Sequence, residues 1–148
     1  MAADFPMKRI SRSAIVECSA MEFYALVEAI ESYPEFLPWC AAAEVRERTP
    51  GRTVAMLTLA VKGVKHSFMT ENSNLPGHSI DIRLIEGPFK QLTAAWRFTA
   101  LGARACKAEY SMDYEFSNRL VAAVLDPVFR RIADTTVDLF TKRLSLAR

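Results

Sequence analysis

The chain has 148 residues, of which 51% are hydrophobic and 24% are charged, and its formal net charge is +2. This length and composition are typical of one folded domain, here residues 1–148, and exclude a disordered or fibrous protein. The small net charge gives no general argument for nucleic-acid binding, and no apolar run approaches the ~18 residues of a membrane span, so any membrane contact would be transient.

The first predicted elements are a strand and a helix. Polar and apolar positions mix over 8–18 as in a strand. Ser19 and Glu22 have the spacing of a capping box, which marks a helix start. Apolar residues then recur at i, i+3, i+4 and i+7, which makes the helix amphipathic: Phe23, Leu26, Val27 and Ile30. Pro34 disfavours helix in the residue before it, which ends this helix near that point and leaves a turn or second short helix at 34–37.

The pattern from residue 43 to residue 116 is typical of strands separated by Gly and Pro turns. The predicted strands cover residues 43–47, 54–61, 66–72, 79–86, 91–99 and 107–116. In the last of them every second residue is apolar or aromatic and the others are polar or charged. Such alternation is typical of an antiparallel sheet with one buried face.

A long helix completes the chain. From Asn118 the apolar period returns to about 3.6 residues and predicts a helix of up to about 28 residues. The order of elements predicts an α+β fold in which a curved antiparallel sheet wraps around this helix. One helix rarely fills the concavity of such a sheet, so we expect an internal apolar cavity with one mouth near residues 33–39.

Cysteines and the N-terminus indicate the compartment. Cys18, Cys40 and Cys106 are odd in number and lack CxxC spacing, so we expect buried free thiols rather than disulfides or zinc ligands. Asp4 and the basic residues that follow it interrupt any apolar stretch of a signal peptide. We therefore expect a cytoplasmic protein.

Charge is unevenly distributed along the chain. Residues 13–45 carry six acids and no Lys or Arg, whereas residues 46–65 carry five basic residues and one acid. This segregation predicts a molecule with two electrically different sides. One interpretation is that both faces are simply solvated. The other is an anionic partner at Arg46, Arg48 and Arg52.

Catalytic signals are weak. His66 falls in a predicted strand and His78 in a Pro-Gly turn, so the sequence predicts no metal site and no catalytic residues. It contains no nucleophile elbow, P-loop or dinucleotide fingerprint. The unusual segment is 31–40, which places four large apolar residues around two prolines: Tyr33, Phe36, Leu37 and Trp39. It fits either the entrance to an apolar pocket or a plug at the end of the sheet.

Three motifs in this order carry a family resemblance: YPEFLPWC at 33–40, EGPFKQL at 86–92 with WRF at 96–98, and YEFSN at 114–118. With them the chain resembles, over about residues 8–146, the coenzyme Q-binding START-like family of the polyketide cyclase and lipid transfer superfamily. Bacterial members of that family include ribosome association toxins. The resemblance implies a helix-grip fold, in agreement with the element order above.

The resemblance also implies a ligand site, with no cofactor required. Phe36, Leu37 and Trp39 would line or gate a tunnel for ubiquinone or a similar polyprenyl lipid. The other candidate ligand-binding residues are Tyr33, Phe89 in the second motif, and the inward-facing Trp96, Tyr110, Met112, Tyr114, Val128, Phe129 and Ile132. Each of these also fits an ordinary core position. Asp126 departs from the family pattern, and we expect it to face outward because an acid is unfavourable in an apolar tunnel.

Three functions remain open. The favoured one is non-enzymatic binding of a hydrophobic ligand that supports respiratory electron transport or quinone delivery. The alternative is a ribosome association toxin that binds the large ribosomal subunit and blocks subunit joining, with the basic hairpin contacting phosphates. A cyclase or aromatase activity is disfavoured, because a fold alone does not transfer activity. The first two functions do not exclude each other.

Overall fold

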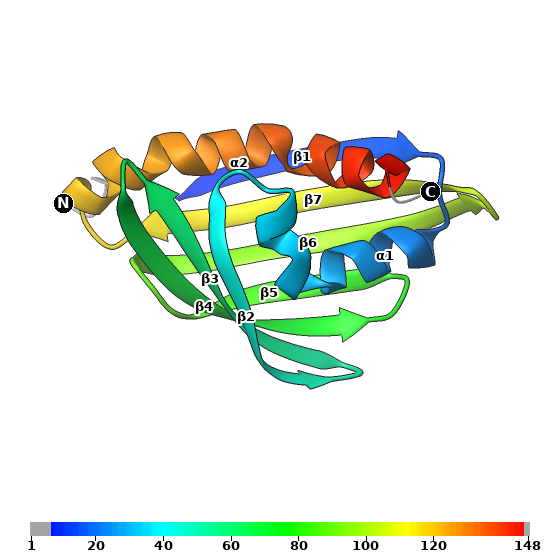
Figure 1. Ribbon diagram of the computed structural model, residues 1–148, viewed down its shortest axis with the longest axis horizontal. Helices are drawn as coiled ribbons and strands as arrows, with labels where there is room; N and C mark the ends of the chain where they lie inside the picture. The colour runs from blue at the N-terminus through cyan, green and yellow to red at the C-terminus, as the bar shows by residue number, and fades with distance from the viewer. Residues whose placement is uncertain (1–6, 147–148) are drawn as a thin grey trace.

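The computed structural model describes residues 7–146 (Figure 1). Its elements are β1 (Lys8–Val16), α1 (Ala20–Glu28), the short 3₁₀ helix η2 (Ile30–Glu35), β2 (Cys40–Thr49), β3 (Arg52–Val61), β4 (Val64–Leu75), β5 (Ser79–Glu86), β6 (Phe89–Gly102), β7 (Ala105–Phe116) and α2 (Arg119–Leu146). Each predicted strand is present, and most extend a few residues further than predicted, because backbone pairing continues into the turns. The long helix has the predicted length of 28 residues.

The seven strands form one antiparallel sheet in the order β1-β7-β6-β5-β4-β3-β2. The first strand lies beside the last, with Lys8 opposite Tyr114 and Val16 opposite Cys106. The sheet curves, and α2 lies along its concave side (Figure 1). α1 contacts β6, β7 and α2 at one end of that side. This arrangement confirms the α+β helix-grip prediction.

The two short helices begin as predicted but divide the chain differently. Ser19 Oγ accepts from the Glu22 amide at 3.1 Å, and the Glu22 carboxylate accepts from the Ser19 amide at 3.0 Å, which confirms the capping box. α1 ends earlier than predicted, because the Tyr33 hydroxyl donates to the Val27 carbonyl, an acceptor that the helix end leaves free. η2 therefore contains Pro34 instead of starting at it.

Two clusters of aromatic rings attach α2 to the rest of the core. Ring centres 5.1–6.3 Å from that of Phe129 belong to Phe68, Phe89, Tyr114 and Phe116. Ring centres 5.1–6.4 Å from that of Phe140 belong to Phe23, Tyr33, Phe36 and Trp96. The two anchors lie about 16 Å apart along the helix at 1.5 Å per residue. The core between them is where the sheet and the helix leave space.

The side chains of Cys18, Cys40 and Cys106 are buried, as predicted, and none of these three forms a disulfide. Within residues 7–146 no helix is long and apolar enough to cross a membrane. The same residues contain no group of three or more His, Cys, Asp or Glu side chains placed to hold a metal ion.

Candidate ligand-binding cavity

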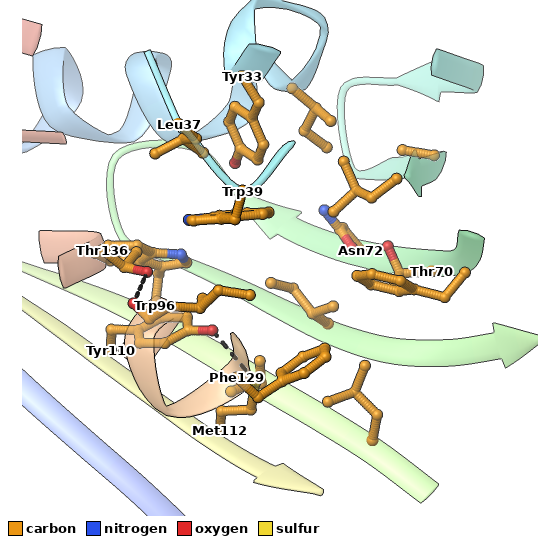
Figure 2. A pocket seen from close by; sticks show the side chains of 18 of the residues that line it. Tyr33, Leu37, Trp39, Thr70, Asn72, Trp96, Tyr110, Met112, Phe129 and Thr136 are labelled. Carbon is orange, nitrogen blue, oxygen red and sulfur yellow. Dashed lines mark hydrogen bonds between the residues drawn. The ribbon is translucent and has the colours of Figure 1, made fainter. Parts of the chain in front are cut away.

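A cavity of about 90 Å³ lies between the sheet, α2 and the segment that follows η2 (Figure 2). It is lined by Ile30, Tyr33, Leu37, Trp39, Ala55, Leu57, Phe68, Thr70, Asn72, Ile82, Leu92, Ala94, Trp96, Tyr110, Met112, Phe129, Ile132, Thr136 and Phe140. Among these described lining residues none carries a charged side chain. Such a lining favours a neutral, mainly apolar ligand.

The regular spacing of side chains in the strands and in α2 places the lining residues on the faces that surround the cavity. In β6, Leu92, Ala94 and Trp96 share the concave face, since side chains alternate between the two faces of a strand. In α2, the lining residues follow the i, i+3, i+7, i+11 stripe that begins at Phe129. The walls are therefore fixed by rigid elements on three sides.

The fourth side is a rim made by residues 36–39. Its backbone turns are closed by hydrogen bonds from the Leu37 amide to the Tyr33 carbonyl at 2.9 Å and from the Cys40 amide to the Leu37 carbonyl at 3.0 Å. Figure 2 shows Leu37 and Trp39 on the side of the cavity opposite Tyr110 and Met112. The rim depends on its own short turns and side-chain packing, whereas the other walls belong to the sheet, α2 and η2.

Phe36 attaches the rim to α2 from outside the cavity. Its ring centre lies 5.1 Å from that of Phe140 and 5.1 Å from the Arg143 guanidinium carbon. Arg143 Nη2 also donates to the Glu35 carboxylate at 2.6 Å. A cation over an aromatic face is attractive, so this contact stabilises the closed rim.

The structure brings eight of the twelve predicted ligand-binding residues to the cavity: Tyr33, Leu37, Trp39, Trp96, Tyr110, Met112, Phe129 and Ile132. The other four, Phe36, Phe89, Tyr114 and Val128, do not line it. Phe89 and Tyr114 pack in the ring cluster around Phe129, at one end of the cavity. Val128 precedes Phe129 and is rotated away from the lining stripe. Ligand contact by any of the twelve stays a prediction.

Sequence reasoning missed the polar part of the lining, Thr70, Asn72 and Thr136. A signal for the first two was present in the predicted strand at 66–72. There Thr70 and Asn72 share a face with Phe68, while Met69 and Glu71 point the other way.

The polar groups of the lining differ in how they are satisfied. Thr136 donates its hydroxyl to the Ile132 carbonyl within its own helix. The Tyr110 hydroxyl faces the Met112 sulfur at 3.5 Å, a weak acceptor. Burial raises the pKa of both Tyr33 and Tyr110, so both phenols stay protonated at neutral pH. Within the described part of the chain, Trp39 Nε1 and Asn72 Oδ1 are buried without a hydrogen-bond partner.

The prediction that Asp126 faces outward is wrong. Its side chain is only 14% exposed. One carboxylate oxygen accepts from the Tyr114 hydroxyl at 3.4 Å and the other from Arg130 at 2.7 Å. Burial, followed by the nearby Asp126 charge, raises the pKa of Tyr114 to about 12. Asp126 does not line the cavity, as expected. Its carboxylate is instead paired with Tyr114 and Arg130 and does not point into solvent.

The basic hairpin is also not a separate positive face. Arg48 contacts Glu28 at 2.9 Å and Glu31 at 2.6 Å, and its hydrogen bond lowers the pKa of Glu31. The neighbouring ion pairs join Arg46 to Glu44, and Arg52 to Glu47 and Glu71. Three guanidinium groups thus meet five carboxylates, so the predicted charge segregation is wrong here. Folding brings the acidic α1 region against the basic hairpin.

The sequence of this chain is similar to a known family and to named proteins. Residues 16–141 match the family model described as "Polyketide cyclase / dehydrase and lipid transport". The chain is 39% identical over 137 residues to the ribosome association toxin RatA of Escherichia coli (strain K12), which covers 93% of this chain and 87% of that protein. It is 28% identical over 142 residues to the mitochondrial coenzyme Q-binding protein COQ10 homolog B of Xenopus laevis, covering 92% of this chain and 58% of that protein.

A solved structure shows the same architecture. The Zhui aromatase/cyclase from Streptomyces sp. R1128 superposes with a TM-score of 0.82 at 16% sequence identity, over 95% of this chain and 94% of that one. At this identity the likeness concerns the fold alone. The helix-grip arrangement is therefore shared by proteins with different activities.

Proposed function

Because this chain belongs to the polyketide cyclase / dehydrase and lipid transport family, we propose that it binds a hydrophobic small molecule in the cavity without altering it chemically. The ligand class is ubiquinone or a related polyprenyl lipid. The proposed role of this protein, located in the cytoplasm, is to deliver the quinone or otherwise support respiratory electron transport. The observation that carries this proposal is the uncharged, largely aromatic and aliphatic lining. Each Å² of apolar ligand surface buried there contributes about 25 cal/mol.

The lining also supports a binder over an enzyme. The described residues around the cavity include no His, Asp, Glu, Lys or Arg, the side chains that most often move protons in catalysis. Tyr33 and Tyr110 have raised pKa values and are poor general bases at neutral pH. A binder needs only shape and apolar area from these walls.

Ligand entry requires the rim to move. The cavity of about 90 Å³ is smaller than the ~150 Å³ that holds a benzene ring in an engineered core. A quinone with even a short isoprenoid tail exceeds it. Because the other walls belong to the sheet, α2 and η2, residues 36–39 are the part that opens. In this proposal ligand binding stabilises a conformation in which the rim is open.

Native mass spectrometry of the protein purified from its own cells tests this proposal. We expect a co-purified quinone or similar lipid at a stoichiometry near one to one, confirmed by solvent extraction. Leu37→Ala or Trp39→Ala should lose it, because both side chains line the cavity at the rim. Leu101→Ala, at an exposed position near the end of β6, is the matched control and should retain the ligand. An empty protein that also ignores added decylubiquinone would refute the proposal.

A second function, association with the ribosome, is favoured by the name of the relative that shares 39% identity over 93% of this chain, and we propose the large subunit as the partner. In this proposal the chain blocks subunit joining from a surface outside the cavity. Arg46, Arg48 and Arg52 are poorly suited to phosphate contact, since each is paired with carboxylates. Lys62 and Lys65, at the β3–β4 turn, are exposed and have no ion pair within residues 7–146.

Co-sedimentation with purified large subunits over a series of salt concentrations tests this second function. We expect binding that weakens with salt, because phosphate contacts release counterions. The double variant Lys62→Gln/Lys65→Gln should bind more weakly and lower the salt slope by about one to two. Arg46→Gln is the control, since its charge is already balanced by Glu44. Absence of co-sedimentation at low salt would contradict the function, and an unchanged double variant would contradict this surface.

A further inference from the structure

Asn72 is a buried polar side chain of the cavity wall whose amide oxygen lacks a hydrogen-bond partner within residues 7–146. It lies in β4, is 6% exposed and lines the cavity. Its Oδ1 atom is buried and has no hydrogen-bond partner among the residues that the structure describes. Buried polar atoms in folded proteins almost always have a partner, so a ligand is a candidate to supply this one.

The polar neighbours of Asn72 on the same wall bond to one another and not to Asn72, and Asn74 Oδ1 is likewise buried without a partner among the described residues. Thr53, directly opposite Asn72 in β3, donates to the Glu28 carboxylate at 3.0 Å and accepts from the Asn74 amide at 3.0 Å. This chain of hydrogen bonds leads away from the cavity to α1. Asn72 therefore remains directed at a lining in which Thr70 is the nearest polar residue along the strand.

The remaining polar lining limits the kind of partner. Thr136 has its proton committed to the Ile132 carbonyl, so it offers no donor to Asn72. Trp39 Nε1 is a donor of the lining that also lacks a partner in the described part of the chain, so the ligand must offer an acceptor as well as a donor. No lining residue among those described is charged, so a cationic donor such as an ammonium group would be buried without a counter-charge. The partner that fits is a neutral hydroxyl group on an otherwise apolar molecule.

We propose that Asn72 selects ligands whose head group carries a neutral hydroxyl, such as a phenol, an alcohol or the hydroquinone form of a quinone. The same molecule without the donor, an ether or an oxidised quinone, binds more weakly. A hydroxyl both donates and accepts, so it satisfies the amide in either orientation, whereas a carbonyl serves only the amide nitrogen. This inference rests on the proposed binding function and specifies its ligand chemistry.

A matched ligand pair tests the inference: 4-heptylphenol and its methyl ether, 4-heptylanisole. Both tryptophans of the chain, Trp39 and Trp96, line the cavity, so quenching of intrinsic fluorescence reports binding directly. We expect the phenol to bind the wild-type protein about five- to tenfold more tightly than the ether, as one net hydrogen bond predicts. Decylubiquinol should likewise bind more tightly than decylubiquinone under anaerobic conditions.

Variants assign the preference to one side chain. Asn72→Leu, of similar size, should remove the phenol preference while retaining affinity for the ether. Thr136→Val should keep the phenol preference, because the Thr136 hydroxyl is already bonded within α2. A phenol that binds the wild type no more tightly than the ether would overturn the inference whether or not Asn72→Leu folds, and so would a preference that survives Asn72→Leu. Failure of both ligands to bind the wild type would refute the binding function itself.

Discussion

Ala94→Leu is expected to weaken binding of a hydrophobic ligand by at least about a hundredfold while the protein stays folded, since displacing several buried methylene groups of ligand costs a few kcal/mol. Ala94 lies in β6 between Ile82 of β5 and Met112 of β7, and all three line the cavity. The extra side-chain atoms would occupy the small volume that the ligand head group needs. Fluorescence titration with decylubiquinone measures the loss of affinity.

The neighbouring residue provides the control. Ala95 lies in the same strand but faces the convex side, where Ser111 is opposite it. Ala95→Leu adds the same atoms outside the cavity and should bind as the wild type does. Thermal unfolding of both variants checks that each is folded. Wild-type affinity in Ala94→Leu would show that the ligand binds somewhere else.

Phe140→Ala is expected to reduce the free energy of unfolding by about 3–5 kcal/mol. Phe140 is 2% exposed, and its ring contacts those of Tyr33 and Phe36 near the rim and that of Trp96 in the sheet. Removing the ring leaves a void that these rigid neighbours cannot fill, and it releases the rim from α2. Urea unfolding followed by fluorescence measures the change.

The same substitution enlarges the cavity. A ligand that binds only the folded state stabilises it by an amount that grows with its affinity. We therefore expect decylubiquinone to stabilise Phe140→Ala more than it stabilises the wild-type protein. Leu120→Ala, at a highly exposed position of the same helix, is the control and should change stability by less than about 0.5 kcal/mol. A loss below about 1 kcal/mol in Phe140→Ala would contradict the packing described here.

Much of the architecture followed from local patterns. The capping box at Ser19, the alternation in 107–116 and the helical period after Asn118 each predicted an element that the structure contains. These patterns are readable because they depend on residues two to four positions apart. The element order then limited the topology, since one long helix is the main cover for the apolar face of an antiparallel sheet. Five of the predicted ligand-binding residues reached the cavity for the same reason of register: Trp96, Tyr110, Met112, Phe129 and Ile132. Tyr33, Leu37 and Trp39 also line it, but they were predicted from the motif at 33–40.

What only the tertiary structure decided depends on residues far apart in the chain. Arg48 meets Glu28 and Glu31 through folding of the hairpin against α1, so charge segregation along the sequence disappears in space. Tyr33 ends α1 by a hydroxyl contact that no helix propensity includes. Asn72 became a candidate selector because it lines the cavity and its buried amide oxygen lacks a hydrogen-bond partner among the described residues. The volume of about 90 Å³ depends on how nineteen side chains from seven elements and the rim pack together. A sequence specifies which face each residue takes, but pairing and empty volume are properties of several segments at once.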